Sequence, residues 1–288
     1  GRERSRDPKS ILAEIKELEK NGYKEITLLG QNVDSYLWYG GGLKKDFKKA
    51  SDIQKKTSIN FAKLLDIVAK SFPKFRIRFT TSNPQDMDNE VLITMKAHNN
   101  ICNHIHLPVQ SGSDKILKEM NRQHTREEYL NLVTEIKTIL PDCGISQDMI
   151  TGFPNETEKD HLDTLSLMNL VKYDFGFMFK YSERPGTLAS RKLDDNIPEE
   201  IKQRRLSEII DLQFKHSFEN LSKYVNKKTV VLIEKESKKS KGFWAGRNEQ
   251  NIMVVFPKED FKTGEFVEVL VKENTATTLK GLGLNRII

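Results

Sequence analysis

The chain has 288 residues, of which 37% are hydrophobic and 31% are charged, and it carries a formal net charge of +6. This length suits one large domain with a small one, or two medium domains, and because no apolar run approaches roughly 20 residues we expect a soluble protein without a membrane-spanning helix. The two cysteines, Cys102 and Cys143, are too few for a disulfide framework or a thiolate metal cluster within this chain, which favours a reducing, cytoplasmic location.

The chain opens with the charged segment GRERSRDPK, which we interpret as part of a longer polypeptide. Asp7 and Pro8 predict the start of a helix, as its N-cap and first helical residue, and apolar residues at helical spacing follow them. The stretch EITLLG predicts a strand over residues 25–30. Residues 38–58 are rich in glycine and lysine with weak periodicity, which predicts a flexible inserted loop.

Helices and strands then alternate as far as residue 181. A helix is predicted from Phe61 to Phe72, and another near residues 87–97; Thr125 with Glu128 forms a capping box, and Thr157 caps a further helix. The intervening strands are predicted over residues 75–80, 103–109, 144–150 and 174–181. This alternation predicts parallel βαβ units in a barrel or an open twisted sheet, and it disfavours an antiparallel sandwich.

Each of the five predicted strands ends in polar or glycine-rich sequence, namely GQN, TTSN, QSGSD, TGFP and YSERPGT. Taken alone, QSGSD could be a loop followed by a helix N-cap. In parallel α/β folds, however, ligands gather outside the carboxyl ends of the strands. Five strands whose polar carboxyl ends meet at one edge of the barrel or sheet therefore predict a ligand site there.

A long helix is predicted from Pro198. We expect one face of it to pack against the preceding barrel, through Leu206, Ile210, Phe214, Phe218 and Leu221. From about Lys227 the pattern changes to short alternating strands with turns about every ten residues. That spacing predicts a small all-β barrel of about 60 residues.

Positive charge is concentrated around the start of this barrel. Between Lys223 and Arg247 there are eight basic and two acidic residues, a local charge of +6. Such a concentration indicates a polyanionic partner, most plausibly nucleic acid, although a solvated lysine-rich face is the alternative. Phe243 and Trp244 lie among the lysines and could stack on bases, or Trp244 could fill the barrel core.

Several common motifs are absent from the sequence. It contains no P-loop, no HExxH and no GxGxxG after a strand, so nucleotide hydrolysis, zinc proteolysis and Rossmann hydride transfer lack support. His104 and His106 alternate on one predicted strand and share a face. One such pair is only half a metal site, and we expect both histidines to be structural.

Six stretches resemble the methylthiotransferase branch of the radical S-adenosylmethionine enzymes: GRERSRDP, TLLGQNVDSY, HLPVQSGSD, REEYL, GFPNETE and YSERPGT. They run in the family's order, and the C-terminal barrel resembles the family's TRAM domain. The resemblance implies an α/β fold, with a partial parallel (β/α)6-type radical S-adenosylmethionine barrel over residues 1–224. A small all-β TRAM barrel that binds RNA would follow over residues 225–288.

The resemblance implies an enzyme that methylthiolates carbon 2 of an N6-isopentenylated adenosine at position 37 of tRNA. Its cofactors would be S-adenosylmethionine and two 4Fe–4S clusters, and its electron donor a flavodoxin or ferredoxin. In this family the CxxxCxxC cluster motif lies just upstream of GRERSRDP, and a preceding domain holds the second cluster. The chain begins after that motif, so we expect it to supply no catalytic cysteine and no metal ligand, and to be inactive alone.

The resemblance also assigns binding residues. Eight residues at strand ends would bind S-adenosylmethionine: Gly30, Gln31, Asn32, Ser82, Gln110, Ser111, Asp148 and Phe153. The first three would meet the amino and carboxylate groups, the next three the carboxylate or ribose, and the last two the adenosine. Six residues would contact RNA: Arg184, Lys238, Lys239, Lys241, Phe243 and Arg247. Arg184 could instead form an ion pair with Glu183 or Asp174.

The sequence departs from the family at two positions, Gln147, where a small residue or threonine is frequent, and Asn155, where glycine is common. Neither change removes a group with an obvious chemical task. Three alternatives stay open: a methylthiotransferase for ribosomal protein or for threonylcarbamoyladenosine, a non-catalytic RNA-binding protein, and a TIM-barrel aldolase or isomerase. The last lacks a candidate lysine or acid/base pair at a strand end, and GQNVDSYLW with the lysine-rich segment after it favours the isopentenyladenosine enzyme.

Overall fold

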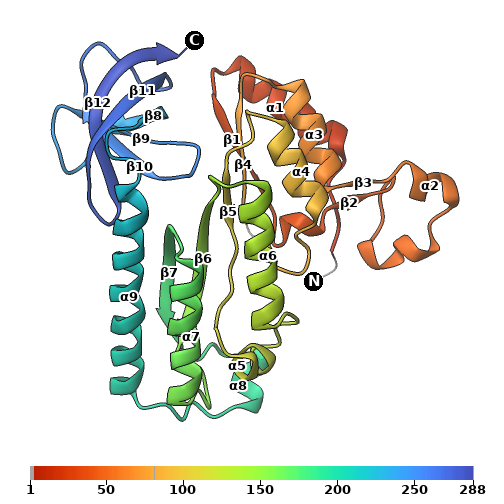
Figure 1. Cartoon of the computed structure of the whole chain (residues 1–288). Helices are drawn as coiled ribbons and strands as arrows, with labels where there is room; N and C mark the ends of the chain where they lie inside the picture. The colour runs from red at the N-terminus through yellow and green to blue at the C-terminus, as the bar shows by residue number, and fades with distance from the viewer. Residues whose placement is uncertain (1–2, 81, 288) are drawn as a thin grey trace. The chain divides into compact units, whose positions relative to one another are not determined.

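The computed structural model describes residues 3–80 and 82–287 (Figure 1). Its contacts divide the chain into two compact units, one formed by Gly1–Ile105 with Ile136–Asp142 and the other by His106–Glu135 with Cys143–Ile288. The small β-barrel therefore groups with the later strands and helices of the α/β region. The boundary predicted near residue 224 lies within the second unit, between α9 (Glu199–Ser222) and β8 (Lys228–Glu236), and stays a prediction.

The first unit contains two parallel strands with helices beside them. Its strands are β1 (Glu25–Leu29) and β4 (Arg76–Thr80), and its larger helices are α1 (Pro8–Lys20), α3 (Phe61–Ser71) and α4 (Asn89–Ala97). As predicted, the Asp7 side chain caps α1 by accepting the backbone N–H of Lys9. Leu29 lies opposite Thr80 in the parallel register, so β1 and β4 end at the same edge.

The segment predicted as a flexible inserted loop, residues 38–58, does lie between β1 and α3, but it contains short helices and part of a strand that the sequence pattern did not predict. After η1 (Val33–Ser35), the segment contains η2 (Lys44–Lys49) and α2 (Asp52–Lys56), and the short strands β2 (Leu37–Trp38) and β3 (Ile59–Asn60) flank these two helices. The two strands pair antiparallel and form a stalk, with Leu37 opposite Asn60. Sequence periodicity missed these elements because each is shorter than the windows on which periodicity depends.

A separate three-stranded sheet has the strand order β5-β6-β7; β6 and β7 belong to the second unit, and the boundary between the units passes through β5. The strands are β5 (His104–His106), β6 (Gly144–Thr151) and β7 (Phe175–Lys180), and the helices before α9 are α5 (Asp114–Glu119), α6 (Arg126–Ile139), α7 (Glu158–Val171) and α8 (Leu188–Lys192). Asp148 on β6 lies opposite Phe177 on β7 in parallel register. Together with β1 and β4, these pairs confirm the parallel α/β architecture that the alternating pattern predicts.

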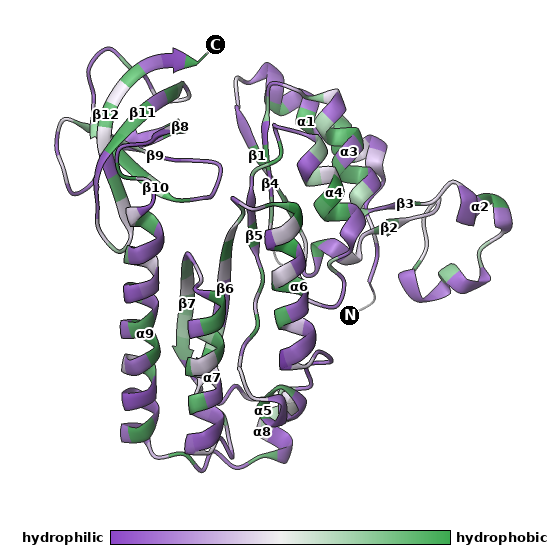
Figure 2. Cartoon of the chain, in the orientation of Figure 1, coloured by the Kyte–Doolittle hydropathy of each residue, from purple (hydrophilic) through white to green (hydrophobic). Residues whose placement is uncertain are grey.

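The long helix α9 (Glu199–Ser222) does not pack through the predicted apolar face. Leu221 is buried, but Phe214 and Phe218 are 47% and 50% exposed. Most of α9 is hydrophilic (Figure 2). Three of its polar side chains instead donate hydrogen bonds to the carbonyl oxygens of residues 172–174, namely Gln213, Ser217 and Asn220. These donors replace apolar contacts, which is why hydrophobic periodicity selected the wrong face.

The C-terminal part of the second unit is a closed barrel with strand order β10-β12-β11-β8-β9. Its strands are β8 (Lys228–Glu236), β9 (Phe243–Arg247), β10 (Met253–Pro257), β11 (Phe266–Asn274) and β12 (Thr278–Ile287). Val254, Phe256 and Val269 are fully buried in its core. Within the described part of the chain, no helix combines the length and the apolar character that crossing a bilayer requires.

Candidate functional site

A cavity of about 870 Å³ in the first unit, here called the strand-end cavity, runs along β1 and past its carboxyl end, and it is also lined by residues of α1 and of the N-terminal segment. Gly30, Gln31 and Asn32, which follow β1 directly, line this cavity. Glu3, Arg4 and Arg6 add charged groups of both signs to its wall. The first predicted cluster of binding residues therefore borders a real hollow at the carboxyl end of a parallel strand.

A carboxylate-centred network ties the two strand ends together. Asn32 Nδ2 donates to Asp86 Oδ2 at 2.5 Å, while the Ser82 hydroxyl donates to Asp34 Oδ1 at 3.3 Å. The backbone N–H of Asn83 donates to the other Asp34 oxygen at 3.2 Å. Burial raises the pKa of the Asp34 carboxyl to about 7, against the lowering effect of these two donors. The network fixes both strand ends before any ligand binds.

The wall of the cavity fits the amino-acid part of a ligand. Asn32 Oδ1 is buried and has no hydrogen-bond partner in the described residues, so it is an unused acceptor for an ammonium group. A Cβ placed on Gly30 would meet no atom closer than 3.6 Å. Space therefore remains above the Gly30 backbone, and a ligand can approach it closely.

In the second unit the QSGSD stretch is docked onto α7. The Ser111 hydroxyl is 1% exposed, accepts the N–H of Ser113 at 3.2 Å and lies 3.4 Å from the hydroxyl of Thr164. The N–H of Gly112 donates to the same Thr164 oxygen at 2.9 Å. The Ser111 hydroxyl therefore forms its hydrogen bonds within the protein and holds its own loop against α7.

Gln110 differs from its neighbours in its backbone. It is a buried, non-glycine residue with φ of 73°, in the left-handed region that most side chains avoid. Its N–H donates to the carbonyl of Asp148, and its carbonyl accepts the N–H of Ile150, so β6 holds the strained conformation on both sides. Strain of this kind, fixed by its surroundings, is typical of binding sites.

Asp148 lies beside a histidine on the neighbouring chain segment. His106 Nε2 is 3.5 Å from Asp148 Oδ1, and His106 Nδ1 is 2.9 Å from the Ser146 hydroxyl. The His106 ring also meets Phe177 edge to face at 6.2 Å. In the described ranges, 3–80 and 82–287, no group of three or more histidine, cysteine or carboxylate side chains is placed to hold a metal ion.

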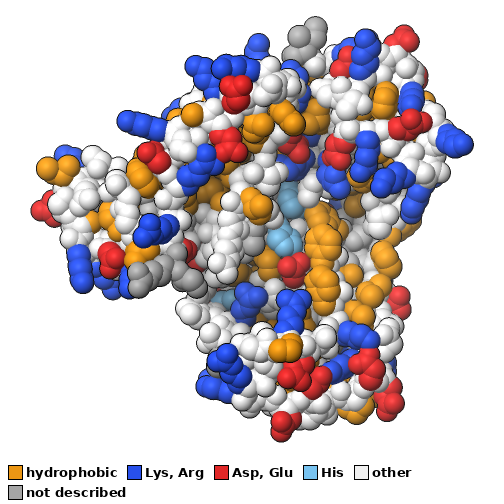
Figure 3. Space-filling model, turned by 180° about the vertical axis from the view of Figure 1, so that it is seen from behind, with side chains coloured by type: hydrophobic (Ala, Val, Ile, Leu, Met, Phe, Trp, Pro, Cys, Tyr) orange, Lys and Arg blue, Asp and Glu red, His pale blue; other side chains and the backbone are white. Residues whose placement is uncertain are grey.

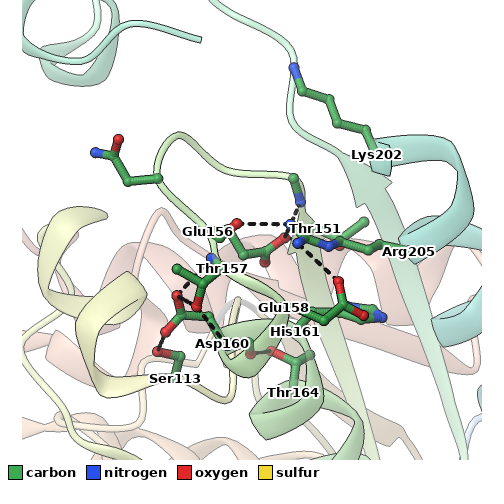
Figure 4. A network of polar contacts seen from close by, with 12 residues as sticks. Ser113, Thr151, Glu156, Thr157, Glu158, Asp160, His161, Thr164, Lys202 and Arg205 are labelled. Atoms are coloured by element: carbon green, nitrogen blue, oxygen red, sulfur yellow. Dashed lines mark hydrogen bonds and ion pairs between the residues drawn. The ribbon is translucent and has the colours of Figure 1, made fainter. Parts of the chain in front are cut away.

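The TGFP turn, which carries Phe153, is held from below by a buried ion pair (Figure 4). Glu156 Oε2 accepts the N–H of Gly152 at 2.7 Å and pairs with Arg205 Nη1 of α9 at 2.9 Å. Both charged side chains are at most 5% exposed, and burial raises the pKa of Glu156. Phe153 is buried against Tyr181, with ring centroids 5.1 Å apart. Sequence reasoning missed this pair.

A second carboxylate in Figure 4 joins the start of α7 to the QSGSD stretch. Asp160 accepts the hydroxyl of Ser113 at 2.6 Å and completes a capping box with Thr157 at the start of α7. Burial opposes ionisation, but these donors and Lys115 hold the pKa of Asp160 down to about 2. The threonine and aspartate three residues apart were the sequence signal for this role.

The six predicted RNA contacts have different surroundings. Lys238, Lys239 and Lys241 are exposed in the turn between β8 and β9, with no salt bridge to another described residue. Arg247 instead forms two hydrogen bonds with the carboxylate of Glu234, at 2.8 and 2.9 Å. Phe243 is partly buried. Figure 3 shows lysine and arginine side chains spread over the surface and mixed with acidic ones.

Two further candidates have clear positions. Trp244 packs against the barrel core, and its indole N–H donates to the carbonyls of Lys258 and Phe261 at 3.1 Å. Trp244 is therefore partly buried at the border of the core rather than inside it. Arg184 is exposed, and its carbonyl accepts the N–H of Thr187.

Two family models match this chain. A family model described as the radical SAM superfamily matches residues 1–168, and a model described as the TRAM domain matches residues 222–282. Among solved structures, coproporphyrinogen III oxidase from Escherichia coli is similar with 16% identity and a TM-score of 0.46, over 83% of this chain and 57% of that one. SuiB of Streptococcus suis, bound to S-adenosylmethionine, has 14% identity and a TM-score of 0.44, over 72% and 39%.

Curated relatives are much more similar in sequence. The chain is 65% identical over 281 residues to the tRNA-2-methylthio-N(6)-dimethylallyladenosine synthase of Christiangramia forsetii, covering 98% of this chain and 58% of that protein. Proteins of the same name from Amoebophilus asiaticus and Bacteroides fragilis are 54% and 51% identical, again over 98% of the chain and over 57% and 59% of their own lengths. The chain thus spans little more than half the length of these relatives.

Proposed function

The chain belongs to the radical SAM superfamily, and we propose that the protein containing it is a tRNA methylthiotransferase acting on carbon 2 of N6-dimethylallyladenosine. The observation that carries this proposal is the 65% identity, over 98% of the chain, to a relative named for that product. The TRAM match over residues 222–282 supports an RNA substrate. We place the enzyme in the cytoplasm and expect a flavodoxin or ferredoxin as electron donor.

The proposed cofactors are S-adenosylmethionine and iron–sulfur clusters. When bound, they supply a carbon-centred radical and the sulfur. Cys102 and Cys143 are both buried and are not joined in a disulfide, and no group of three or more potential metal ligands exists among residues 3–80 and 82–287. The residues present therefore do not fit a cluster, and its ligands would lie elsewhere in the whole protein.

The residues present do fit the organic part of S-adenosylmethionine. Asn32 would accept a hydrogen bond from the ammonium group through its unused amide oxygen, and the bare backbone at Gly30 would allow close contact. Gln31, Ser82 and Gln110 remain candidates for the carboxylate and ribose. We assign Ser111 to positioning its loop rather than to the ligand, because its hydroxyl is engaged within the protein.

Asp148 and Phe153 remain candidates for the adenosine side. Asp148 is paired with His106, and Phe153 lies on the turn fixed by the Glu156–Arg205 ion pair. Both positions are therefore held by contacts within the protein, partly exposed at Asp148 and buried at Phe153, and this lowers the entropy cost of binding.

The test is mass spectrometry of nucleosides from digested tRNA, in cells lacking the parent gene and in cells complemented with the full-length gene. We expect 2-methylthio-N6-dimethylallyladenosine to disappear on deletion, with the unmethylthiolated nucleoside accumulating, and to return on complementation. An unchanged nucleoside profile would refute the proposal. A mass change in a ribosomal protein would then point to the ribosomal methylthiotransferases.

A further inference from the structure

Residues 37–60 form a separate structural feature, here called the lysine arm. In Figure 1 it projects from the rest of the first unit, with β2 and β3 as its stalk and α2 near its tip. Among the described residues of the arm there are six lysines, Lys44, Lys45, Lys48, Lys49, Lys55 and Lys56. The only acidic residues of the arm are Asp46 and Asp52, so the arm has a local charge of +4 (six minus two).

The arm is internally braced. The Tyr39 and Phe47 rings are 5.2 Å apart, and the Tyr39 hydroxyl donates to the carbonyl of Leu43 at 2.7 Å. Gly42 has φ of 104°, and a Cβ there would lie 2.7 Å from the Tyr39 hydroxyl, so only glycine suits the turn. Ser51 and Gln54 form a capping box that starts α2. A disordered lysine-rich loop would need none of these devices.

The arm's charge is mostly unmatched. Lys44 is 3.7 Å from Asp86, whereas Lys45, Lys48, Lys49, Lys55 and Lys56 are exposed and form no salt bridge with any residue the structure describes. Several of these lysines lie in the last turns of η2 and α2, where cations favour the helix dipole. That effect is confined to the last turn, and it does not explain why these five lysines have no salt-bridge partner among the described residues.

The base of the arm is fastened to the wall of the strand-end cavity. The N–H of Leu37 donates to the Ser5 hydroxyl at 2.8 Å, and the Tyr36 hydroxyl donates to the carbonyl of Arg6 at 2.7 Å. Ser5, Arg6 and Tyr36 all line that cavity. If one group of a polyanion binds in the cavity, the parts of the polyanion next to that group therefore lie near the arm.

We propose that the lysine arm binds the phosphate backbone of RNA next to the nucleotide presented to the strand-end site. This inference rests on the proposed function and names a contact surface for the same substrate. Exposed lysines without acidic partners suit phosphates, whose binding releases counterions. A membrane surface fits less well, because Ile53 is the only large hydrophobic side chain of the arm among those most exposed in the described chain.

The test uses the whole protein and an RNA hairpin that carries N6-dimethylallyladenosine in its loop. Its variant is Lys45→Gln/Lys48→Gln/Lys49→Gln. Because three phosphate contacts are removed, we expect binding to weaken about 10-fold near 0.1 M salt, and the slope of log affinity against log salt to fall by about 2 to 3. The charge-retaining variant Lys45→Arg/Lys48→Arg/Lys49→Arg should bind nearly as the parent protein does.

The matched control is Lys16→Gln/Lys24→Gln/Lys74→Gln. These lysines are also exposed in the first unit but lie outside the arm, and Lys24 and Lys74 precede the amino ends of β1 and β4. The control should bind within about 2-fold of the parent protein. If both glutamine variants weakened binding equally, or if the arm variant bound as the parent protein does, the lysine-arm inference would fail while the proposed function would stand. If the parent protein neither binds nor modifies the hairpin, the proposed function fails as well.

Discussion

Two adjacent arginines of α9 show how burial changes the role of a charged residue. Arg205 is 4% exposed and pairs with the equally buried Glu156, whereas Arg204 binds Glu158 and Glu208 at the surface. A buried charge left without its partner pays a large desolvation cost, but water readily replaces a partner at the surface. The two positions therefore make a natural matched pair.

We expect Arg205→Gln to lower the free energy of unfolding by about 3 to 5 kcal/mol, since it leaves the Glu156 carboxylate buried and unpaired. Burial already raises the pKa of Glu156. A raised folded-state pKa means that stability is lost as pH rises through it, so the deficit should be larger at pH 8 than at pH 5. Urea unfolding at both pH values measures this. Arg204→Gln is the control and should change little; equal losses would contradict the assignment.

Sequence reasoning found the TGFP turn but not the pair that supports it. Glu156 and Arg205 are 49 residues apart, and nothing in either local pattern indicates the other. Asp34 was also missed, because its burial depends on the Ser82 strand end, 48 residues away. Residue types at strand ends were predictable, whereas the distant residues that hold them in place were not.

At the scale of elements, the QSGSD stretch is both a strand end and a docking loop. A Cβ on Gly112 would lie 2.6 Å from the carbonyl oxygen of Asp163 and 2.6 Å from Thr164 Cα, which are backbone atoms of α7. Such atoms cannot move without displacing the helix. The purely structural interpretation of this stretch, as a turn followed by a helix cap, is therefore correct for Gly112 and Ser113. It does not exclude a role for Gln110 in binding.

We expect Gly112→Ala to destabilise the protein by about 1 to 3 kcal/mol, because it overpacks the contact with α7. Gly30→Ala is the comparison, since its Cβ would meet only ordinary contacts at 3.6 Å or more. It should leave the melting temperature nearly unchanged and still weaken S-adenosylmethionine binding, measured by equilibrium dialysis with the whole protein. Unaltered affinity in Gly30→Ala would remove Gly30 from the proposed site.

The elements themselves were predicted with uneven success. Asp7, Thr125 and Thr157 marked helix starts, and β1, β4, β6 and β7 lie where apolar runs predicted strands. The packed face of α9 was wrong because hydrogen-bonding side chains, such as Gln213, occupy it. The lysine arm was missed because its order depends on aromatic and glycine contacts within a short segment. Periodicity detects long amphipathic elements and little else.

At the scale of the whole molecule, unmatched positive charge occurs in both compact units. The first unit carries the lysine arm, and the second carries Lys238, Lys239 and Lys241 between β8 and β9. Arg247, predicted from sequence as a further RNA contact, already pairs with Glu234. Net charge alone could not separate exposed cations from neutralised ones, because that distinction depends on which acidic residue lies opposite.

If both units bind one RNA, the losses of binding free energy from substituting the two sets of lysines should add. We expect Lys238→Gln/Lys239→Gln/Lys241→Gln to weaken hairpin binding about as much as the arm variant does, and the six-fold variant to weaken it by roughly the product of the two factors. Filter binding of the whole protein at three salt concentrations measures both affinity and salt slope. Arg247→Gln is the control and should leave the salt slope unchanged, since its charge is already matched. If the variant with all six substitutions bound the hairpin as tightly as the triple variant with the lower affinity, only one unit would contact the RNA.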